Sequence, residues 1–469
     1  MKDYVFGMIG LGTMGRNLLL NMADHGYKVA GHDKDQSKID LLTKESSKEN
    51  VKGFHSINEF VESLKKPRAI MMLVPAGKIV DQVIAEIAPL LDEGDLLIDG
   101  GNSHFTDTNR RVEELKGKKL HFFGMGISGG EEGARKGPSM MPGGDEKAYQ
   151  VVQSVLESVA AKVKGEPCVT YIGPGASGHF VKMVHNGIEY GIMQLLAETY
   201  ELMKNGLKLS DEKMHSTFKE WNDGRLQSFL VEITRDIFAF KEKGVDHLLL
   251  EDIKDEARSK GTGKWTSQVA MDLQSPTTLI DTAVAMRDLS KYKTLRTKAA
   301  TMYKGPEAIK TSSPDEFLIA IEGAFYFSTI IAYAQGMHLL SQASKEFKYN
   351  LRMDKIALIW RGGCIIRSAF LEDIYQAYKK DVNLEHLLLD SGIQDKVNSV
   401  ISHARTVVAA AVSSGIAIPA FTAALSYFDT FRSARMPSNL IQAQRDYFGA
   451  HTYERIGKDG VFHTQWLAK

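Results

Sequence analysis

The first 130 residues alternate short apolar runs with helix-like patterns. The apolar runs are each long enough for one buried strand and fall at residues 4–9, 28–31, 69–74, 96–98 and 120–123, with a helix expected at about 14–25. Such alternation is typical of a parallel sheet covered by helices. With one more strand expected at residues 168–172, the pattern predicts an α/β domain over residues 1–177.

From residue 178 the periodicity changes. Apolar residues recur at three- and four-residue spacing and strand signals nearly vanish, which predicts a large all-helical domain over residues 178–436. Long apolar helices are expected at 180–203 and 317–340, offset by 137 residues, and Trp221-Asn-Asp-Gly224 returns 139 residues later as Trp360-Arg-Gly-Gly363. Duplicated helical halves would explain both offsets, whereas chance could produce one four-residue match.

Residues 437–469 form a separate C-terminal tail. This segment is short on helical periodicity and rich in Gly, Arg, His and aromatic residues. A polar, aromatic tail after a finished domain either frays or docks onto a partner subunit, and the pattern leaves both alternatives open.

Composition narrows the class of protein. Lys plus Arg equals Asp plus Glu, at 58 each, so no global field gathers nucleic acid or an anionic membrane. Two cysteines cannot form a disulfide framework, and no targeting segment is expected before the first strand, so we expect a soluble, cytoplasmic protein. The uncharged stretch 407–428 is long enough for a membrane span, but Gly415 and Pro419 interrupt it, which favours two buried helices.

A glycine-rich motif follows the first strand and opens the first helix. In Gly10-Leu-Gly12-Thr-Met-Gly15 the first glycine permits the tight turn, the second lets a pyrophosphate approach, and the third permits close helix–strand packing. The phosphates would lie at the helix N-terminus. The motif alone would also fit a structural turn. Its position between a strand and a helix predicts a Rossmann-type dinucleotide site.

The end of the second strand predicts cofactor preference. Asp33 lies 21 residues beyond Gly12, where an acid commonly accepts hydrogen bonds from the adenosine ribose and would repel a 2′-phosphate. We therefore expect NAD to be favoured over NADP, although Lys34 could pair with a phosphate. The segment Asp99-Gly-Gly-Asn102 has two interpretations. Either Asn102 bridges cofactor and substrate, or Gly100-Gly101 only turn the chain. The candidate cofactor residues are Gly10, Leu11, Gly12, Thr13, Met14, Gly15, Asp33, Lys34, Asp35, Leu73, Val74, Pro75 and Asn102.

The segment 182–190 carries a polar stripe on an otherwise apolar helix. With Lys182 at 0° and about 100° per residue, three more polar residues fall on the same face at about 300°, about 40° and about 340°, namely His185, Asn186 and Glu189. A solvated face with ion pairs is one interpretation. The helix continues as Ile192-Met-Gln-Leu-Leu-Ala197, however, which is typical of a core helix, and burying such a stripe is costly without a function.

These residue types suit oxidation of a secondary alcohol. A lysine whose pKa is lowered by burial can accept a hydroxyl proton during hydride transfer, and a glutamic acid can later donate one to an enol. No metal is expected, because His451 and His463 are far apart in sequence and no paired cysteines or H-E-x-x-H motif occurs.

Several motifs together resemble the 6-phosphogluconate dehydrogenase family. Besides the glycine motif and the 182–190 helix, they are Ser128-Gly129-Gly130-Glu-Glu-Gly133, Gly137-Pro-Ser-Met-Met-Pro-Gly-Gly144, Lys260-Gly-Thr-Gly-Lys-Trp-Thr266 and Gln442-Ala-Gln-Arg445-Asp-Tyr-Phe-Gly-Ala-His451-Thr-Tyr. The resemblance spans nearly the whole chain. It implies oxidative decarboxylation of 6-phosphogluconate to ribulose 5-phosphate by a homodimer.

The resemblance also implies residue roles. Lys182 would be the base and then the acid during loss of carbon dioxide, and Glu189 would protonate the enediol. The sugar acid would be held by Asn102, Ser128, Gly129, Gly130, His185 and Asn186, and its phosphate by Tyr190, Lys260, Thr262 and Arg287, with Arg445 and His451 reaching it from the tail of the other subunit. Taken singly, each of the basic residues would also suit a plain surface charge.

Two departures from the family pattern concern the cofactor. The family usually carries Asn-Arg-Thr or Asn-Arg-Ser after the second strand and Lys-Ala-Gly after the fourth, where this chain has Asp33-Lys34-Asp35 and Pro75-Ala-Gly77. Both reduce positive charge near the adenosine. Two alternative functions stay open: a related β-hydroxyacid dehydrogenase acting on a non-phosphorylated acid, and a non-catalytic cofactor-binding scaffold.

Overall fold

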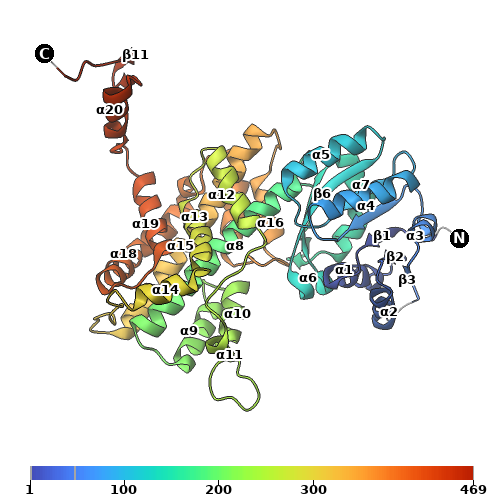
Figure 1. Ribbon diagram of the computed structural model, residues 1–469, viewed down its shortest axis with the longest axis horizontal. Coiled ribbons are helices and arrows are strands. Elements are labelled where there is room, and N and C mark those ends of the chain that lie inside the picture. Colours follow the sequence, from blue (N-terminus) through green and yellow to red (C-terminus); the bar gives the residue numbers. More distant parts are fainter. Residues whose placement is uncertain (1–2, 47–48, 468–469) are drawn as a thin grey trace.

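The computed structural model describes residues 3–46 and 49–467. A seven-stranded sheet with flanking helices forms the amino-terminal domain, a larger helical body follows, and the last segment projects away from that body (Figure 1). The predicted fold class is therefore confirmed. Met1 and Lys2, where no targeting segment is expected, lie outside the described residues.

The sheet has the strand order β3-β2-β1-β4-β5-β6-β7, and β7 alone runs antiparallel to its neighbour. The strands are β1 Phe6–Ile9, β2 Val29–His32, β3 Val51–Phe54, β4 Ala69–Met72, β5 Leu96–Asp99, β6 His121–Ser128 and β7 Ser139–Gly144. Alternate apolar residues of β1 to β6 join two different apolar clusters, one on each face. Strands buried on both faces read as continuous apolar runs, which is why the sequence reveals β1, β2, β4 and β5.

Helices cover both faces of the sheet. One face carries α1 Thr13–Asp24, α2 Gln36–Glu45 and α7 Glu146–Val159, and the other carries α3 Ile57–Ser63, α4 Lys78–Ile87 and α5 Phe105–Lys116. The short α6 Gly130–Lys136 packs against α1. Because parallel strands end at one edge, the loops after β1, β4, β5 and β6 meet there, which is where ligands bind in such sheets.

The predicted strand at 168–172 is wrong. Only Val169 bridges β7, at Met140, although Met140 N donates to Cys168 O at 3.0 Å and Ile172 N donates to Pro142 O at 2.8 Å. Pro142 has no N–H to continue the ladder. The prediction also missed β3 and β7, because β3 has few apolar residues and β7 contains proline and glycine, which are poor strand formers.

The helical domain begins with the buried α8 Ser177–Glu201, which packs along the longer α15 Pro314–Glu346. Around this pair lie α9 Asp211–Asp223, α10 Phe229–Ile237, α11 Leu249–Asp252, α12 Thr262–Asp272, α13 Thr278–Ser290, α14 Lys293–Ala300, α16 Met353–Trp360, α17 Phe370–Lys380, α18 Ser391–Ser414 and α19 Pro419–Phe431. In the described part of the chain, α15 is the one helix long and apolar enough to span a membrane, but 89% of its most apolar window is buried within the protein.

The uncharged stretch 407–428 is divided between two helices, as predicted. α18 ends at Ser414, and Gly415 adopts a left-handed conformation with φ of 72° that closes its last turn. α19 then begins at Pro419, whose fixed φ suits the first turn of a helix. The interruption therefore comes from the two residues that the sequence analysis singled out.

The halves of the helical domain repeat one another in detail. α8 and α15 begin 137 residues apart, and α13 and α19 match at both ends with an offset of 141. Ser228 and Ser368, at an intermediate offset, bridge each other in antiparallel fashion, as equivalent residues do across a two-fold axis. These positions agree with the predicted duplication.

A pair of buried side chains carries the same repeat. Glu198 of α8 accepts hydrogen bonds from Ala420 N and Phe421 N at the start of α19, at 2.9–3.1 Å. Gln335 of α15, 137 residues later, accepts from Leu279 N at the start of α13 at 3.1 Å. Each half therefore caps a helix of the other half, once with a carboxyl group and once with an amide.

We expect Glu198→Gln to reduce the pH dependence of stability. Burial raises the pKa of Glu198 to about 7, against the opposing hydrogen bonds of Ala420 and Phe421. The folded state thus keeps a proton that the unfolded chain releases at lower pH, so stability is present at low pH and is lost as pH rises through about 7. Wild type should lose about 1 kcal/mol of unfolding free energy between pH 6 and 8 through this group.

Urea unfolding of both proteins at the two pH values measures this difference. Glu201→Gln serves as the control, since Glu201 lies on the same helix and accepts only from Asn205. An unchanged fall in stability of the Glu198→Gln variant would mean that another group causes it.

The tail differs from its prediction. It contains a helix, α20 Ser438–Gly449, followed by a hairpin of β10 Tyr453–Arg455 and β11 Lys458–Phe462. The helical period was hard to detect because its apolar residues, such as Leu440, Ile441 and Phe448, are exposed rather than packed in this chain. Figure 1 shows α20 and the hairpin standing away from the helical body, on the side opposite the sheet.

Candidate active site

The glycine-rich loop has the geometry of a phosphate cradle. Gly10 has φ of 94°, and a Cβ there would lie 2.5 Å from Leu73 O, while a Cβ on Gly15 would lie 1.9 Å from Gly10 O. Gly12, in contrast, faces open space and precedes α1, which has no side-chain cap on its first N–H groups. Free N–H groups and open space at a helix N-terminus fit a dinucleotide pyrophosphate. Thr13 and Met14 supply the first turn of that helix.

A groove beside this loop is lined by five of the predicted cofactor residues, Asp33, Lys34, Leu73, Val74 and Pro75. Asp33 Oδ2 accepts from Leu11 N at 2.8 Å, so this carboxylate fixes the glycine loop as well as facing the groove. Asp35 caps α2 by accepting from Ser37 N at 3.0 Å. Asn102 lies on the exposed loop after β5, where Gly101 N donates to Asp99 Oδ1 at 3.0 Å and shapes the turn.

α8 brings the predicted polar stripe into the protein interior. Lys182 is 5% exposed and His185 is fully buried, which excludes a solvated polar face. Asn186 Nδ2 donates to Glu189 Oε2 at 3.2 Å, and His185 Nδ1 lies 4.0 Å from the same oxygen. Asn186 Oδ1 and His185 Nδ1 are buried without a hydrogen-bond partner among the described residues. Unsatisfied buried polar atoms of this kind fit a polar ligand.

Burial sets the protonation of this stripe. Desolvation lowers the pKa of Lys182, while Glu189 and Cys364 oppose that shift. Desolvation likewise raises the pKa of Glu189, opposed by Lys182 and Arg287. Burial also lowers the pKa of His185, to which the nearby Lys182 adds. Burial therefore shifts the amine, the carboxyl and the imidazole toward their neutral forms, which are the forms that a base, an acid and a hydrogen-bonding group need.

β6 delivers the Ser-Gly-Gly motif to this stripe. Ser128 ends the strand, and its Oγ lies 3.2 Å from His185 Nε2. Gly129 and Gly130 have φ of 124° and 62°, so they turn the chain into α6 with backbone N–H groups exposed at its start. Side chains at these positions would be strained.

A loop that the prediction missed completes this wall. Residues 361–365 follow α16, and Ile365 N donates to Ser128 Oγ at 3.2 Å. Gly363 O accepts from Ser139 N at 2.8 Å and lies where a Cβ on Gly129 would be only 2.6 Å away. The sequence pattern of Trp360-Arg-Gly-Gly363 indicates only its similarity to Trp221-Asn-Asp-Gly224 and not this contact. Its two glycines were the signal that a backbone approaches closely there.

The other side of the stripe is basic. The Arg287 guanidinium lies 3.5 Å from the centroid of the Tyr190 ring. Its charge partly opposes the rise in the pKa of Glu189 that burial causes. α12 packs tightly on α8, since a Cβ on Gly263 would lie 2.4 Å from the Tyr190 ring. Thr262 begins α12, and Lys260 lies exposed two residues earlier. Tyr190 and Arg287 therefore lie together at one end of the stripe, with the start of α12 packed beside them.

Arg445 and His451 are not part of this cluster. Both are exposed on the tail, which projects away from the chain's own site (Figure 1). Arg445 Nη1 donates only locally, to Gln442 Oε1 at 3.2 Å. Within one chain, two of the predicted phosphate contacts are thus separated from the others.

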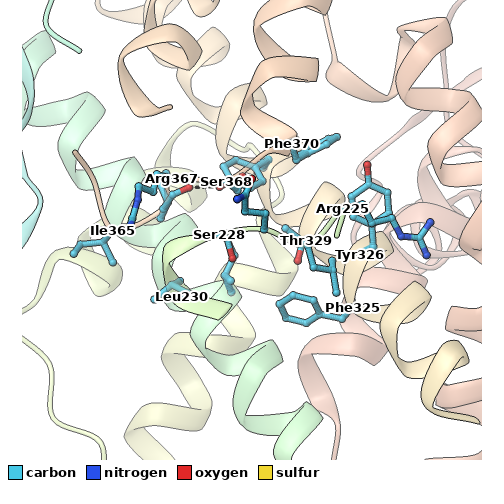
Figure 2. Close-up of a pocket in the computed structure, with 15 residues that line it drawn as sticks. Arg225, Ser228, Leu230, Phe325, Tyr326, Thr329, Ile365, Arg367, Ser368 and Phe370 are labelled. Atoms are coloured by element: carbon cyan, nitrogen blue, oxygen red, sulfur yellow. Dashed lines mark hydrogen bonds between the residues drawn. The ribbon is translucent and has the colours of Figure 1, made fainter. Parts of the chain in front are cut away.

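A second pocket lies inside the helical domain and contains none of the predicted site residues. Figure 2 shows it between the matched halves, with Ser228 and Leu230 on one side and Arg367, Ser368 and Phe370 on the other. Thr329 Oγ1 is buried there without a hydrogen-bond partner among the described residues, and the space suits a single water molecule. We assign this pocket to imperfect packing between the halves.

A glycine-rich loop after the first strand of a Rossmann-type sheet, together with a buried lysine on the first helix of an all-helical domain, is typical of the class of NAD(P)-linked hydroxyacid dehydrogenases. A family model described as the NAD binding domain of 6-phosphogluconate dehydrogenase matches residues 5–173. A second, described as 6-phosphogluconate dehydrogenase, C-terminal domain, matches residues 178–466. The chain therefore belongs to the 6-phosphogluconate dehydrogenase family.

Individual relatives agree along the whole chain. The chain is 48% identical to 6-phosphogluconate dehydrogenase, NADP(+)-dependent, decarboxylating, of Bacillus subtilis, and 47% identical to the decarboxylating enzyme of Escherichia coli, with all of each chain covered. It superposes on Plasmodium falciparum 6-phosphogluconate dehydrogenase with a TM-score of 0.95 at 43% identity, over 98% of this chain and 100% of the other. That enzyme was solved alone, with its cofactor NADP+ and with its substrate 6-phosphogluconate.

Proposed function

We propose that this chain catalyses the oxidative decarboxylation of 6-phosphogluconate to ribulose 5-phosphate and carbon dioxide, with reduction of NAD(P)+. The observation that carries the proposal is the placement of the buried Lys182 and the 17% exposed Glu189 on one face of α8, beside the glycine turn after β6. The full-length relatives supply the substrate, because their names and the Plasmodium complex specify 6-phosphogluconate.

Lys182 acts first as a base. A bound nicotinamide supplies the hydride acceptor. The neutral amine takes the proton of the C3 hydroxyl as hydride leaves C3, which becomes a carbonyl carbon. The ammonium then stabilises the negative charge that develops on the C3 oxygen when the C1–C2 bond breaks and carbon dioxide departs. Burial assists this role because it favours the neutral amine before reaction.

Glu189 acts last as an acid. Burial raises its pKa, which favours the protonated form that can donate to the carbon that lost the carboxylate. This step converts the enediol to ribulose 5-phosphate. Ser128, His185 and Asn186 bind the sugar acid in this proposal, since His185 Nδ1 and Asn186 Oδ1 are buried without a hydrogen-bond partner among the described residues and Ser128 Oγ lies beside His185 Nε2. Asn102 and the Gly129-Gly130 turn complete this set, while Tyr190, Lys260, Thr262 and Arg287 bind the phosphate.

NAD is the preferred cofactor in this proposal. Asp33 and Asp35 flank Lys34 at the position where a 2′-phosphate would lie, and like charges repel it. The Bacillus subtilis relative is named NADP(+)-dependent. The proposed preference for NAD therefore rests on this chain's own residues after β2, Asp33-Lys34-Asp35.

Initial rates on 6-phosphogluconate test activity and preference together. We expect kcat/KM to be about tenfold higher with NAD than with NADP, since each misplaced charge near a phosphate costs about 1 kcal/mol. One carbon dioxide should be released for each reduced cofactor. A higher kcat/KM with NADP would refute the preference alone. An absence of carbon dioxide with either cofactor would refute the proposed reaction.

The tail supports a homodimer as the active unit. Asp446 is fully buried within it and accepts from Thr452 N at 3.0 Å, His463 Nδ1 at 2.9 Å and Trp466 Nε1 at 2.8 Å. This carboxylate ties α20 to the hairpin, so Arg445 and His451 are held on a small ordered unit with exposed apolar residues. Such a unit suits docking on a second copy, whose phosphate site lacks these two cations. Balanced charge and two buried free thiols favour a cytoplasmic setting.

A further inference from the structure

Glu86 lies on α4 and lines the same groove as the glycine loop and Asp33. It is 52 residues from Lys34 in sequence and belongs to none of the recognised motifs. The groove places it opposite the end of β2, where the adenosine ribose would lie. Its carboxylate therefore faces the part of a dinucleotide that distinguishes NAD from NADP.

We call the charged residues at this end of the groove the rim; they are Asp33, Lys34, Asp35, Lys38 and Glu86. Both lysines of the rim have carboxylate partners. Lys34 Nζ lies 2.7 Å from Glu86 Oε2, and Lys38 Nζ lies 3.4 Å from Asp33 Oδ2. With Asp35, the rim holds three acids and two lysines, so its formal charge is negative. Lys34 stands at the position of the family's phosphate-contacting arginine. Its ammonium group is already paired with the Glu86 carboxylate.

We propose that Glu86 is a specificity-determining residue that disfavours a 2′-phosphate by pairing with Lys34. The inference rests on the proposed use of a nicotinamide dinucleotide. A phosphate that approached Lys34 would have to displace the Glu86 carboxylate or lie beside it. Since Lys34 is 74% exposed and Glu86 is 38% exposed, the pair is weak enough to be broken, and the effect is a graded preference rather than a block.

The variant Glu86→Gln tests this role in the full-length enzyme. It keeps the size of the side chain and removes its charge. We expect KM for NADP to fall about threefold to tenfold, with kcat nearly unchanged and KM for NAD within about twofold of wild type. The gain should shrink in about 0.5 M salt, because the charges are exposed.

Two controls make the result specific. Glu93→Gln removes a carboxylate from another surface pair, with Lys119 at 2.9 Å, outside the groove, and should leave both KM values unchanged. In a Lys34→Gln background Glu86→Gln should give a clearly smaller gain, because Glu86 then has no lysine partner to release. An equal gain in that background, or an unchanged KM for NADP in the single variant, overturns the proposal.

Wild-type rates and the Glu86→Gln variant together distinguish a wrong cofactor preference from a wrong role for Glu86. If wild type prefers NADP, the proposed cofactor preference is wrong, but Glu86→Gln still lowers KM for NADP if Glu86 holds Lys34. If wild type prefers NAD and Glu86→Gln changes nothing, then the preference comes from Asp33 and Asp35 without a contribution from Glu86.

Discussion

Lys182→Met is expected to lower kcat on 6-phosphogluconate at least about a thousandfold. It removes the group that accepts the hydroxyl proton and stabilises the developing charge, and these contributions together span several powers of ten. Methionine fits the same buried site, because Lys182 is 5% exposed and its amine has no hydrogen bond or ion pair with any described residue. Folding should therefore be retained.

Steady-state rates and dinucleotide titration measure the two parts separately. Binding of NAD should change little, because Lys182 lies outside the groove of the glycine loop. Lys204→Met is a matched control, since Lys204 lies just beyond the same helix and pairs with Asp211 at 2.9 Å. Should Lys182→Met keep kcat within tenfold of wild type, the assignment of the base would be wrong.

Removal of the tail after Pro437 is expected to raise KM for 6-phosphogluconate at least about a hundredfold. Arg445 and His451 would each provide a charge-assisted hydrogen bond to the substrate phosphate, and each such bond contributes about 1.5–3 kcal/mol. The body of the chain should still fold, because the tail projects away from it. Circular dichroism and steady-state kinetics measure the two outcomes. Arg455→Ala, which changes an exposed arginine in the hairpin, is the control.

Subunit mixing shows whether the tail acts on the other chain. A Lys182→Met chain has an intact tail, and an Arg445→Ala chain has an intact lysine. If the tail serves the partner's site, a mixed dimer contains one complete site, and random reassociation of the two weak variants should restore about a quarter of wild-type activity. No recovery after mixing would mean that each tail serves its own chain or has no part in the site.

The local parts of the site could be predicted from the sequence. The glycine loop depends on residues within one turn, and the stripe from Lys182 to Glu189 depends on helical spacing alone. Both were therefore visible without coordinates. The strands with continuous apolar runs were visible for the same reason, since burial on both faces leaves a pattern in each segment by itself.

The remaining parts depend on contacts between distant segments. The Gly363 carbonyl reaches β7 across more than two hundred residues, and the partner of Lys34 is on α4, so neither leaves a local pattern. The helix α20 was missed because its apolar residues are not buried in a single chain. A prediction from burial periodicity fails for a helix whose apolar side chains stay exposed in its own chain.

The bonds from the 361–365 loop to β6 and β7 restrict how this enzyme can open. Ser139 N donates to Gly363 O and Ser139 Oγ to Ile359 O at the end of α16, both at 2.8 Å, so two hydrogen bonds join the sheet to the helical domain next to the contact between Ser128 and His185. Jaw-like closure of one domain on the other would break them. We therefore expect the two domains to keep the same arrangement around Ser128 and His185 with and without ligand.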